Sequence, residues 1–199
     1  MLKWLRPKST EIIVVSGLPR SGTSLMMQML EAGGLPILMD NLRPPDSNNP
    51  RGYYEYEPAR RLYQGNTGWL DQARGHGVKI VSPLLEYLPP DYNYSLIFMN
   101  RPLYEVLRSQ AVMLEKQHAP SQPDDLQTRY TEHLTSTKTW LTRQPNFRVL
   151  QVDYHHVLQQ PHSSAAEITA FCRHPLDPEA MAAVVDLRLY RQRTTPHAP

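Results

Sequence analysis

The sequence contains a single cysteine, Cys172, and no apolar run near the roughly 20 residues that a membrane-spanning helix requires. One cysteine excludes an internal disulfide and a cluster of thiolate metal ligands, and its apolar helical surroundings predict a core position. The basic N-terminal stretch 1–8 leads directly into a predicted strand, without the apolar region and cleavage site of a secretory signal. We therefore expect a soluble protein without a membrane span, in a reducing, cytoplasmic compartment.

A strong charge of either sign is also missing, because 21 Lys and Arg residues against 19 Asp and Glu residues leave a net charge of +2. The basic residues are scattered, so nucleic-acid binding through phosphate neutralisation is not expected, although a local anion pocket is compatible with this composition. A length of 199 residues with 40% hydrophobic residues is typical of one compact domain. We expect one domain over residues 1–199, with a frayed tail at 194–199.

Short apolar runs alternate with helical patterns along the chain. The runs predict buried strands at residues 11–16, 78–82, 94–100 and 147–152. The patterns between and after them predict helices at residues 22–32, 58–73, 102–117, 123–143, 161–173 and 178–185. This alternation predicts an α/β three-layer sandwich around a mostly parallel sheet, with the ligand site at the carboxyl ends of the strands.

Residues 40–57, DNLRPPDSNNPRGYYEYE, have no clear period and are rich in proline, asparagine and tyrosine. A long irregular segment in a small domain is usually functional or disordered. Its tyrosines favour order, since disordered segments contain few aromatic residues. We expect this segment to form an ordered lid.

The segment Gly17-Leu-Pro-Arg-Ser-Gly22-Thr23-Ser24 has the spacing of a Walker loop and lies between a predicted strand and a predicted helix. Backbone N–H groups and the positive end of the helix could therefore surround a tetrahedral oxyanion. The Walker lysine is absent, however, because Thr23 stands in its place, and no strand ends in an acidic residue that would hold magnesium. Arg20 supplies a cation within the turn, so the set could hold phosphate without a metal.

The run GLPRSGTSL resembles the 5′-phosphosulfate-binding loop of sulfotransferases that use 3′-phosphoadenylyl sulfate (PAPS). Members of that superfamily hold the 3′-phosphate with an arginine at a strand end and a serine eight residues later, which here are Arg101 and Ser109. The resemblance implies a P-loop NTPase-like fold, PAPS as cosubstrate and no metal. It also implies a nucleotide site made of Pro19, Arg20, Ser21, Gly22, Thr23, Ser24, Arg101 and Ser109.

The resemblance extends over roughly residues 11–175 with weaker motifs. The segment NPRGYYE at 49–55 is similar to one in bacterial relatives, and Lys79 falls where many members have a lysine at a strand end. The family's late Tyr-Glu-Asp-Leu turn is replaced here by Asp153-Tyr-His-His156, so roles for its acidic positions do not carry over. Tyr53, Tyr54 and Lys79 are candidates for substrate binding.

Catalysis by such an enzyme requires cations at the leaving oxygen and a base at the acceptor hydroxyl. Arg20 fits the first task, and Lys79 could assist it. Several families with this form of the loop have a glutamate about twenty residues later, where this chain has Asp40; the alternative is that Asp40 caps a turn or helix. Glu55 is the second candidate base, and its alternative is a solvated loop carboxylate.

Three functions remain open from the sequence. The first is a sulfotransferase acting on a hydroxyl of a small molecule, glycan or lipid. The second is a nucleotide or small-metabolite kinase that uses the same loop, and the third is a non-catalytic, sulfotransferase-like nucleotide-binding protein. The chain is short for the resemblance, so a neighbouring subunit in a homodimer could complete the acceptor pocket.

Overall fold

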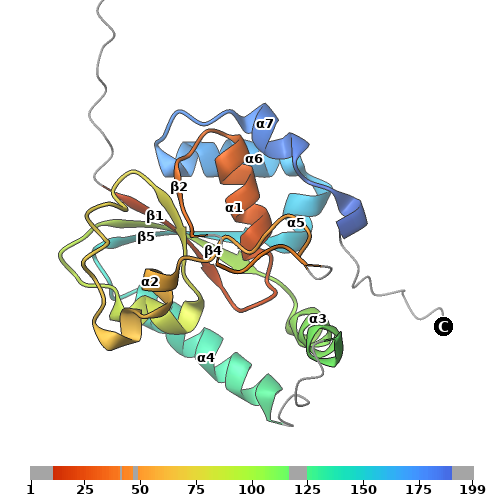
Figure 1. The fold of residues 1–199 in the computed structure, drawn as a ribbon, viewed down its shortest axis with the longest axis horizontal. Coiled ribbons are helices and arrows are strands. Elements are labelled where there is room, and N and C mark those ends of the chain that lie inside the picture. Colours follow the sequence, from red (N-terminus) through yellow and green to blue (C-terminus); the bar gives the residue numbers. More distant parts are fainter. Residues whose placement is uncertain (1–10, 41, 47–48, 117–124, 190–199) are drawn as a thin grey trace, which may run out of the picture.

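The fold is built on a five-stranded sheet, seen in a computed structural model that describes residues 11–40, 42–46, 49–116 and 125–189. The expected frayed tail at 194–199 lies outside these residues. All neighbouring strands are parallel, and their order across the sheet is β2-β3-β1-β4-β5 (Figure 1). The strands are β1 (Ile12–Gly17), β2 (Ile37–Leu38), β3 (Gly77–Lys79), β4 (Tyr94–Asn100) and β5 (Phe147–Asp153).

The central strand β1 is buried along its whole length, as its continuous apolar sequence predicted. Ile13 and Val15 point to one face of the sheet and Ile12 and Val14 to the other, since they belong to two separate core clusters. Successive side chains of a strand alternate between its faces, so an apolar run requires cover on both sides. The predicted three-layer α/β architecture is confirmed.

Helices cover both faces of the sheet (Figure 1). One face carries α1 (Thr23–Ala32), α5 (Tyr154–Gln159), α6 (Pro161–Cys172) and α7 (Pro178–Ala183). The other carries α2 (Glu57–Arg60), α4 (Leu126–Leu141) and two 3₁₀ segments, Leu62–Gln64 and Ser82–Tyr87. Helix α3 (Leu103–Lys116) follows β4 beyond the carboxyl edge of the sheet, and a last 3₁₀ turn is Leu187–Leu189. Within the described part of the chain, none of the helices combines the length and apolar character needed to cross a bilayer.

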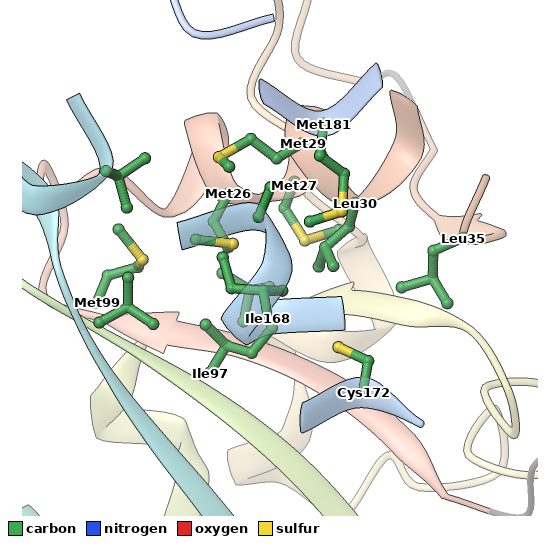
Figure 2. Close-up of a cluster of buried hydrophobic side chains, with 14 of the residues drawn as sticks. Met26, Met27, Met29, Leu30, Leu35, Ile97, Met99, Ile168, Cys172 and Met181 are labelled. Carbon is green, nitrogen blue, oxygen red and sulfur yellow. The ribbon is translucent and has the colours of Figure 1, made fainter. Parts of the chain in front are cut away.

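The core between α1 and the sheet is rich in methionine (Figure 2). Met26, Met27 and Met29 of α1 are completely buried beside Ile168 of α6 and Met181 of α7. Unbranched methionine side chains fill irregular gaps, which suits a helix packed against three neighbours at once. The predicted core position of Cys172 is also confirmed, and burial raises the pKa of its thiol to about 12.

The helix predicted for residues 58–73 is wrong. Only α2 and one 3₁₀ turn form there, because Gly65 adopts a left-handed conformation with φ of +77°, Asn66 and Thr67 have no regular structure, and turns follow from Gly68. Two elements were not predicted from the sequence: β2, which has only two residues, and α5, which forms in place of the expected turn at residues 153–156. The Asp153 carboxylate starts α5 by accepting the N–H of His156 at 2.8 Å.

The turn after β1 depends on a glycine that has no room for a side chain. Gly17 has φ of +146°, and a Cβ atom added there would lie 2.5 Å from Ser21 Oγ and 2.7 Å from the Met99 carbonyl oxygen. We predict that Gly17→Ala lowers the free energy of unfolding by about 2 kcal/mol or more, as measured by urea denaturation. Gly65→Ala is the matched control, since Gly65 also has positive φ but no heavy atom within 4 Å of the added carbon, and should lose only about 1 kcal/mol. Equal losses would contradict this explanation.

Candidate functional site

The first loop joins the carboxyl end of β1 to the N-terminus of α1. Gly17, Arg20 and Gly22 all have positive φ, which folds the chain into a tight turn that ends at Thr23, the first residue of the helix. Gly22 also allows close approach, because a Cβ atom there would lie 2.4 Å from the Tyr154 ring. The turn thus presents backbone N–H groups and the positive end of α1 to the same space, a geometry that favours anions.

Arg101 lies directly beyond β4 and is fixed from three directions. Its Nε donates to Glu105 Oε2 at 2.8 Å, and its Nη1 donates to the Arg20 carbonyl oxygen at 3.0 Å. Its Cζ lies 4.6 Å from the centre of the Tyr154 ring. Because the Arg101 side chain is only 7% exposed and that of Glu105 only 1%, this ion pair is strongly held. Arg101 therefore ties the first loop to α3.

The Arg20 side chain reaches the same helix. Its Nε donates to Ser109 Oγ at 3.0 Å, so the two motifs that the sequence places 89 residues apart are in direct contact. Burial lowers the pKa of the Arg20 guanidinium, the charge of Arg101 acts in the same direction, and the Tyr53 and Asp46 side chains oppose them. A bound anion would relieve this repulsion between neighbouring arginines.

Lys79 is the last residue of β3, and its side chain contacts Ser24 at the end of the first loop. Its Nζ donates to the Tyr53 carbonyl oxygen and lies 3.4 Å from Ser24 Oγ, which also accepts a hydrogen bond from Asn49 Nδ2 at 3.1 Å. Burial lowers the pKa of Lys79 to about 8; the negative charge of Glu55 opposes the shift, whereas nearby arginines add to it. The amine is therefore poised to gain or lose a proton near neutral pH.

The segment 40–57, which we call the lid, is irregular over most of its described residues and contacts the first loop, where Tyr53 and Asn49 are hydrogen-bonded to Ser24. Its centre is Tyr53, whose hydroxyl donates to Asp46 and whose ring lies 3.5 Å below the Arg43 guanidinium carbon. Glu55 pairs with Arg43 at 3.1 Å and with Arg60 at 3.9 Å. These contacts give the described part of the lid a defined path.

A cavity of about 380 Å³ lies where the lid, the first loop and α3 meet. Ten of the predicted site residues line it: Pro19, Arg20, Gly22, Thr23, Ser24, Tyr53, Glu55, Lys79, Arg101 and Ser109. Among the described residues, the wall carries more cations than carboxylates, since it includes Arg20, Arg43, Arg60, Lys79 and Arg101 but only two carboxylates, those of Glu55 and Asp186. A cavity with this excess of positive charge is suited to a polyanion.

Three predicted residues do not line this cavity. Ser21 is buried, and its hydroxyl has no hydrogen-bond partner within the described part of the chain. Tyr54 turns away and donates its hydroxyl to Glu31 at 2.5 Å. The Asp40 carboxylate accepts the backbone N–H groups of Leu42 at 3.0 Å and Glu57 at 2.5 Å. Asp40 thus caps the start of α2 and one end of the lid, the alternative that the sequence left open.

Glu105 and its neighbour His155 also belong to the site and were not predicted from the sequence. His155 Nε2 lies 2.9 Å from Glu105 Oε1, so one buried carboxylate contacts both His155 and Arg101. The available signal was the spacing of four residues between Arg101, which lies just before α3, and Glu105 in its first turn, because a spacing of four brings side chains together at a helix start. No pattern in the neighbouring sequence indicated a site role for His155, which lies in α5.

The model of the sulfotransferase domain family matches residues 89–193, just over half of the 199-residue chain. The chain therefore belongs to the sulfotransferase family. The matched part includes Arg101 and Ser109 but not the first loop. A search of curated proteins found no match.

Solved structures of sulfotransferases share the fold. The sulfotransferase domain of a Synechococcus olefin synthase has a TM-score of 0.54 and 16% sequence identity, with 96% of this chain and 86% of that chain covered. A sulfotransferase from Mycobacterium tuberculosis has a TM-score of 0.59 and 18% identity, with 92% of this chain and 73% of that chain covered. This similarity confirms the predicted P-loop-like sulfotransferase fold.

We predict that the Lys79 amine titrates near pH 8, far below its ordinary value of 10.5, because folding buries the ammonium. The unfolded chain then keeps this proton to higher pH than the folded chain. The cost of burying the charge is therefore fully present below about pH 8 and is relieved as the pH rises toward 10.5. Carbon NMR of ¹³Cε-labelled lysine measures the midpoint, with the Lys79 signal assigned by its loss in Lys79→Arg. A midpoint close to 10.5 would contradict the burial seen here.

Proposed function

We propose that the protein is a sulfotransferase that binds PAPS and transfers its sulfuryl group to a hydroxyl acceptor. The observation that carries this proposal is the direct contact between the two anion-binding motifs. Arg20 donates to Ser109, Arg101 donates to the Arg20 carbonyl oxygen, and all three residues line one cationic cavity. A nucleotide with phosphate groups at both 3′ and 5′ positions matches such a pair of adjoining sites.

The first loop is the proposed site of the 5′-phosphosulfate. The backbone N–H groups at the start of α1, the Thr23 and Ser24 hydroxyls and the Arg20 guanidinium can donate to its oxygens. Arg101 and Ser109 are the proposed partners of the 3′-phosphate. Since Arg101 is held rigidly by Glu105, little conformational entropy would be lost when it binds this phosphate.

The proposed reaction forms a bond between the acceptor oxygen and sulfur, while the bond between sulfur and the bridging phosphate oxygen breaks. The products are a sulfate monoester and adenosine 3′,5′-bisphosphate, and the hydroxyl proton passes to a base. Negative charge grows on the bridging oxygen, so cations that contact it stabilise the transition state. Arg20 and the protonated form of Lys79 are the proposed cations, and a bound polyanion would keep Lys79 protonated.

Glu55 is the proposed base. Its carboxylate lies on the cavity wall near Lys79, whereas both hydrogen bonds of Asp40 go to the backbone of the lid and α2. Arg43 and Arg60 hold the Glu55 carboxylate in place through its two oxygens. Asp40 is thereby proposed as a residue that shapes the lid rather than one that takes the proton.

The nucleotide site is tested by calorimetric titration with adenosine 3′,5′-bisphosphate. Arg20→Ala should lose at least about 3 kcal/mol of binding free energy, since the guanidinium supplies several charge-assisted hydrogen bonds. Ser109→Ala should lose about 1 to 3 kcal/mol through one such bond. Arg108→Ala is the matched control, because Arg108 is exposed on the same helix and does not line the cavity. Wild-type affinity in both site variants would refute the proposed site.

The base is tested by comparing Glu55→Gln with Asp40→Asn in steady-state transfer assays. We expect Glu55→Gln to lower kcat by about 10² to 10⁴-fold, the range typical of general bases, while affinity for the bisphosphate changes little. Asp40→Asn should lower the melting temperature, because a carboxylate that accepts two backbone N–H groups is lost, and should leave kcat of the folded protein near the wild-type value. The reverse pattern would assign the proton transfer to Asp40.

A further inference from the structure

Glu105 presents its two carboxylate oxygens to partners on different elements. Oε2 accepts a hydrogen bond from Arg101 Nε at 2.8 Å, and Oε1 lies 2.9 Å from His155 Nε2. The Glu105 side chain is only 1% exposed, so protein groups take the place of water around it. A carboxylate accepts hydrogen bonds and donates none, so the His155 nitrogen that faces it carries a proton. His155 is therefore a hydrogen-bond donor to Glu105.

Neighbouring strands bring His155 to this carboxylate. Asn100 at the end of β4 is paired with Asp153 at the end of β5. The residues that follow them, Arg101 and Tyr154, are in contact, with the guanidinium carbon 4.6 Å from the centre of the ring. Asp153 caps α5, in which His155 is the second residue. Two consecutive residues of α5 thus hold Arg101: Tyr154 directly, and His155 through the carboxylate of α3.

His155 does not itself face a ligand in the cavity. Among the described residues, the cavity lining includes Arg101 and Tyr154 but neither Glu105 nor His155. The Tyr104 hydroxyl lies 3.4 Å from the same Glu105 Oε1 atom, so His155 is the closer of these two donors. Any effect of His155 on a bound phosphate must therefore pass through Glu105 and Arg101.

The orientation of the Arg101 guanidinium decides what this group can bind. It is planar, and its Nε and Nη1 donate to Glu105 and to the Arg20 carbonyl oxygen. A phosphate that accepts two N–H groups of one arginine needs the guanidinium plane to face it. The last torsion of a glutamate side chain is only loosely restricted by its own rotamer preference. The bond from His155 to Oε1 fixes this torsion, and with it the direction in which Oε2 holds Arg101.

We infer that His155 is a positioning residue for the 3′-phosphate: through Glu105, its Nε2–H holds the Arg101 guanidinium in the orientation that binds this group. The inference rests on the proposed function, which assigns the 3′-phosphate to Arg101 and Ser109. A charge on His155 is not required, because a neutral N–H donor at the same place fixes the carboxylate in the same way. A nucleotide without a 3′-phosphate has no group for Arg101 to face, so its affinity depends little on His155.

The inference is tested by calorimetric titration of three variants with adenosine 3′,5′-bisphosphate and with adenosine 5′-phosphate. His155→Leu removes the donor and should weaken the bisphosphate about tenfold, while the affinity for the monophosphate changes less than about threefold. His155→Gln keeps an N–H donor at the position of Nε2 and should bind the bisphosphate within about threefold of wild type. His155→Asn is polar but one methylene too short to reach Glu105, so it should behave as His155→Leu does. The Asn variant provides the same test if the Leu variant does not fold.

His156→Leu is the matched control for these substitutions. His156 is the next residue of α5, and its side chain is exposed. The backbone N–H that it donates to Asp153 is kept in the variant, so the start of α5 is preserved. Both nucleotides should bind this variant with wild-type affinity. The melting temperature of each variant shows whether it is folded at the temperature of the titration.

The outcomes separate a positioning role from a merely structural one. A structural role would weaken both nucleotides together and would not distinguish Gln from Leu at position 155. Either of these results, or wild-type affinity for the bisphosphate in His155→Leu, would overturn the inference and leave the proposed function intact. If wild-type protein does not bind adenosine 3′,5′-bisphosphate, the proposed function fails and this inference fails with it.

Discussion

The ion pair between Arg101 and Glu105 is the interaction on which the rest of the site depends. Both side chains are almost fully buried, so removing either one would take from the other its closest opposite charge, and a buried charge that loses such a partner is destabilising. The pair fixes Arg101 beside the first loop. There the Arg101 guanidinium packs against the Tyr154 ring and donates a hydrogen bond to the Arg20 carbonyl oxygen. This hydrogen bond holds the backbone of Arg20, which has positive φ, and the Arg20 side chain itself donates to Ser109 of α3. A helix that follows β4 thereby shapes a loop that follows β1.

The cavity gathers positively charged side chains in one place, an arrangement that costs stability in the folded chain. Arg20 and Lys79 are both partly deprived of water, and burial lowers the pKa of each. Repulsion among these cations reduces the stability of the folded protein, whereas a bound polyanion would attract each of them and offset this repulsion. The lid contributes to this arrangement through Tyr53. Its carbonyl oxygen accepts a hydrogen bond from Lys79, and its ring stacks against the Arg43 guanidinium. Tyr53 of the lid is therefore in direct contact with two of the cations on the cavity wall.

Local sequence was sufficient for the parts of the fold that are determined locally. The first loop could be predicted because a β-branched run, two glycines and a helical pattern lie within twenty residues. The helix predicted over residues 58–73 was wrong because its apolar spacing continued past Gly65, whose backbone ends the regular structure. Glu105 and His155 could not be assigned to the site, since their meeting depends on how α3 and α5 pack. The choice between Asp40 and Glu55 likewise depends on the path of the lid, which composition does not determine.

The central claim is that the first loop and the Arg101–Ser109 motif form one site for two phosphate groups. Isothermal titration calorimetry with adenosine 3′,5′-bisphosphate, adenosine 5′-phosphate and magnesium ATP tests this claim on the unmodified protein. The account predicts that the bisphosphate binds at least about 100-fold more tightly than either of the other nucleotides, because only it can engage both motifs with charge-assisted bonds. Equal affinity for the bisphosphate and the monophosphate, or tighter binding of magnesium ATP, would contradict it.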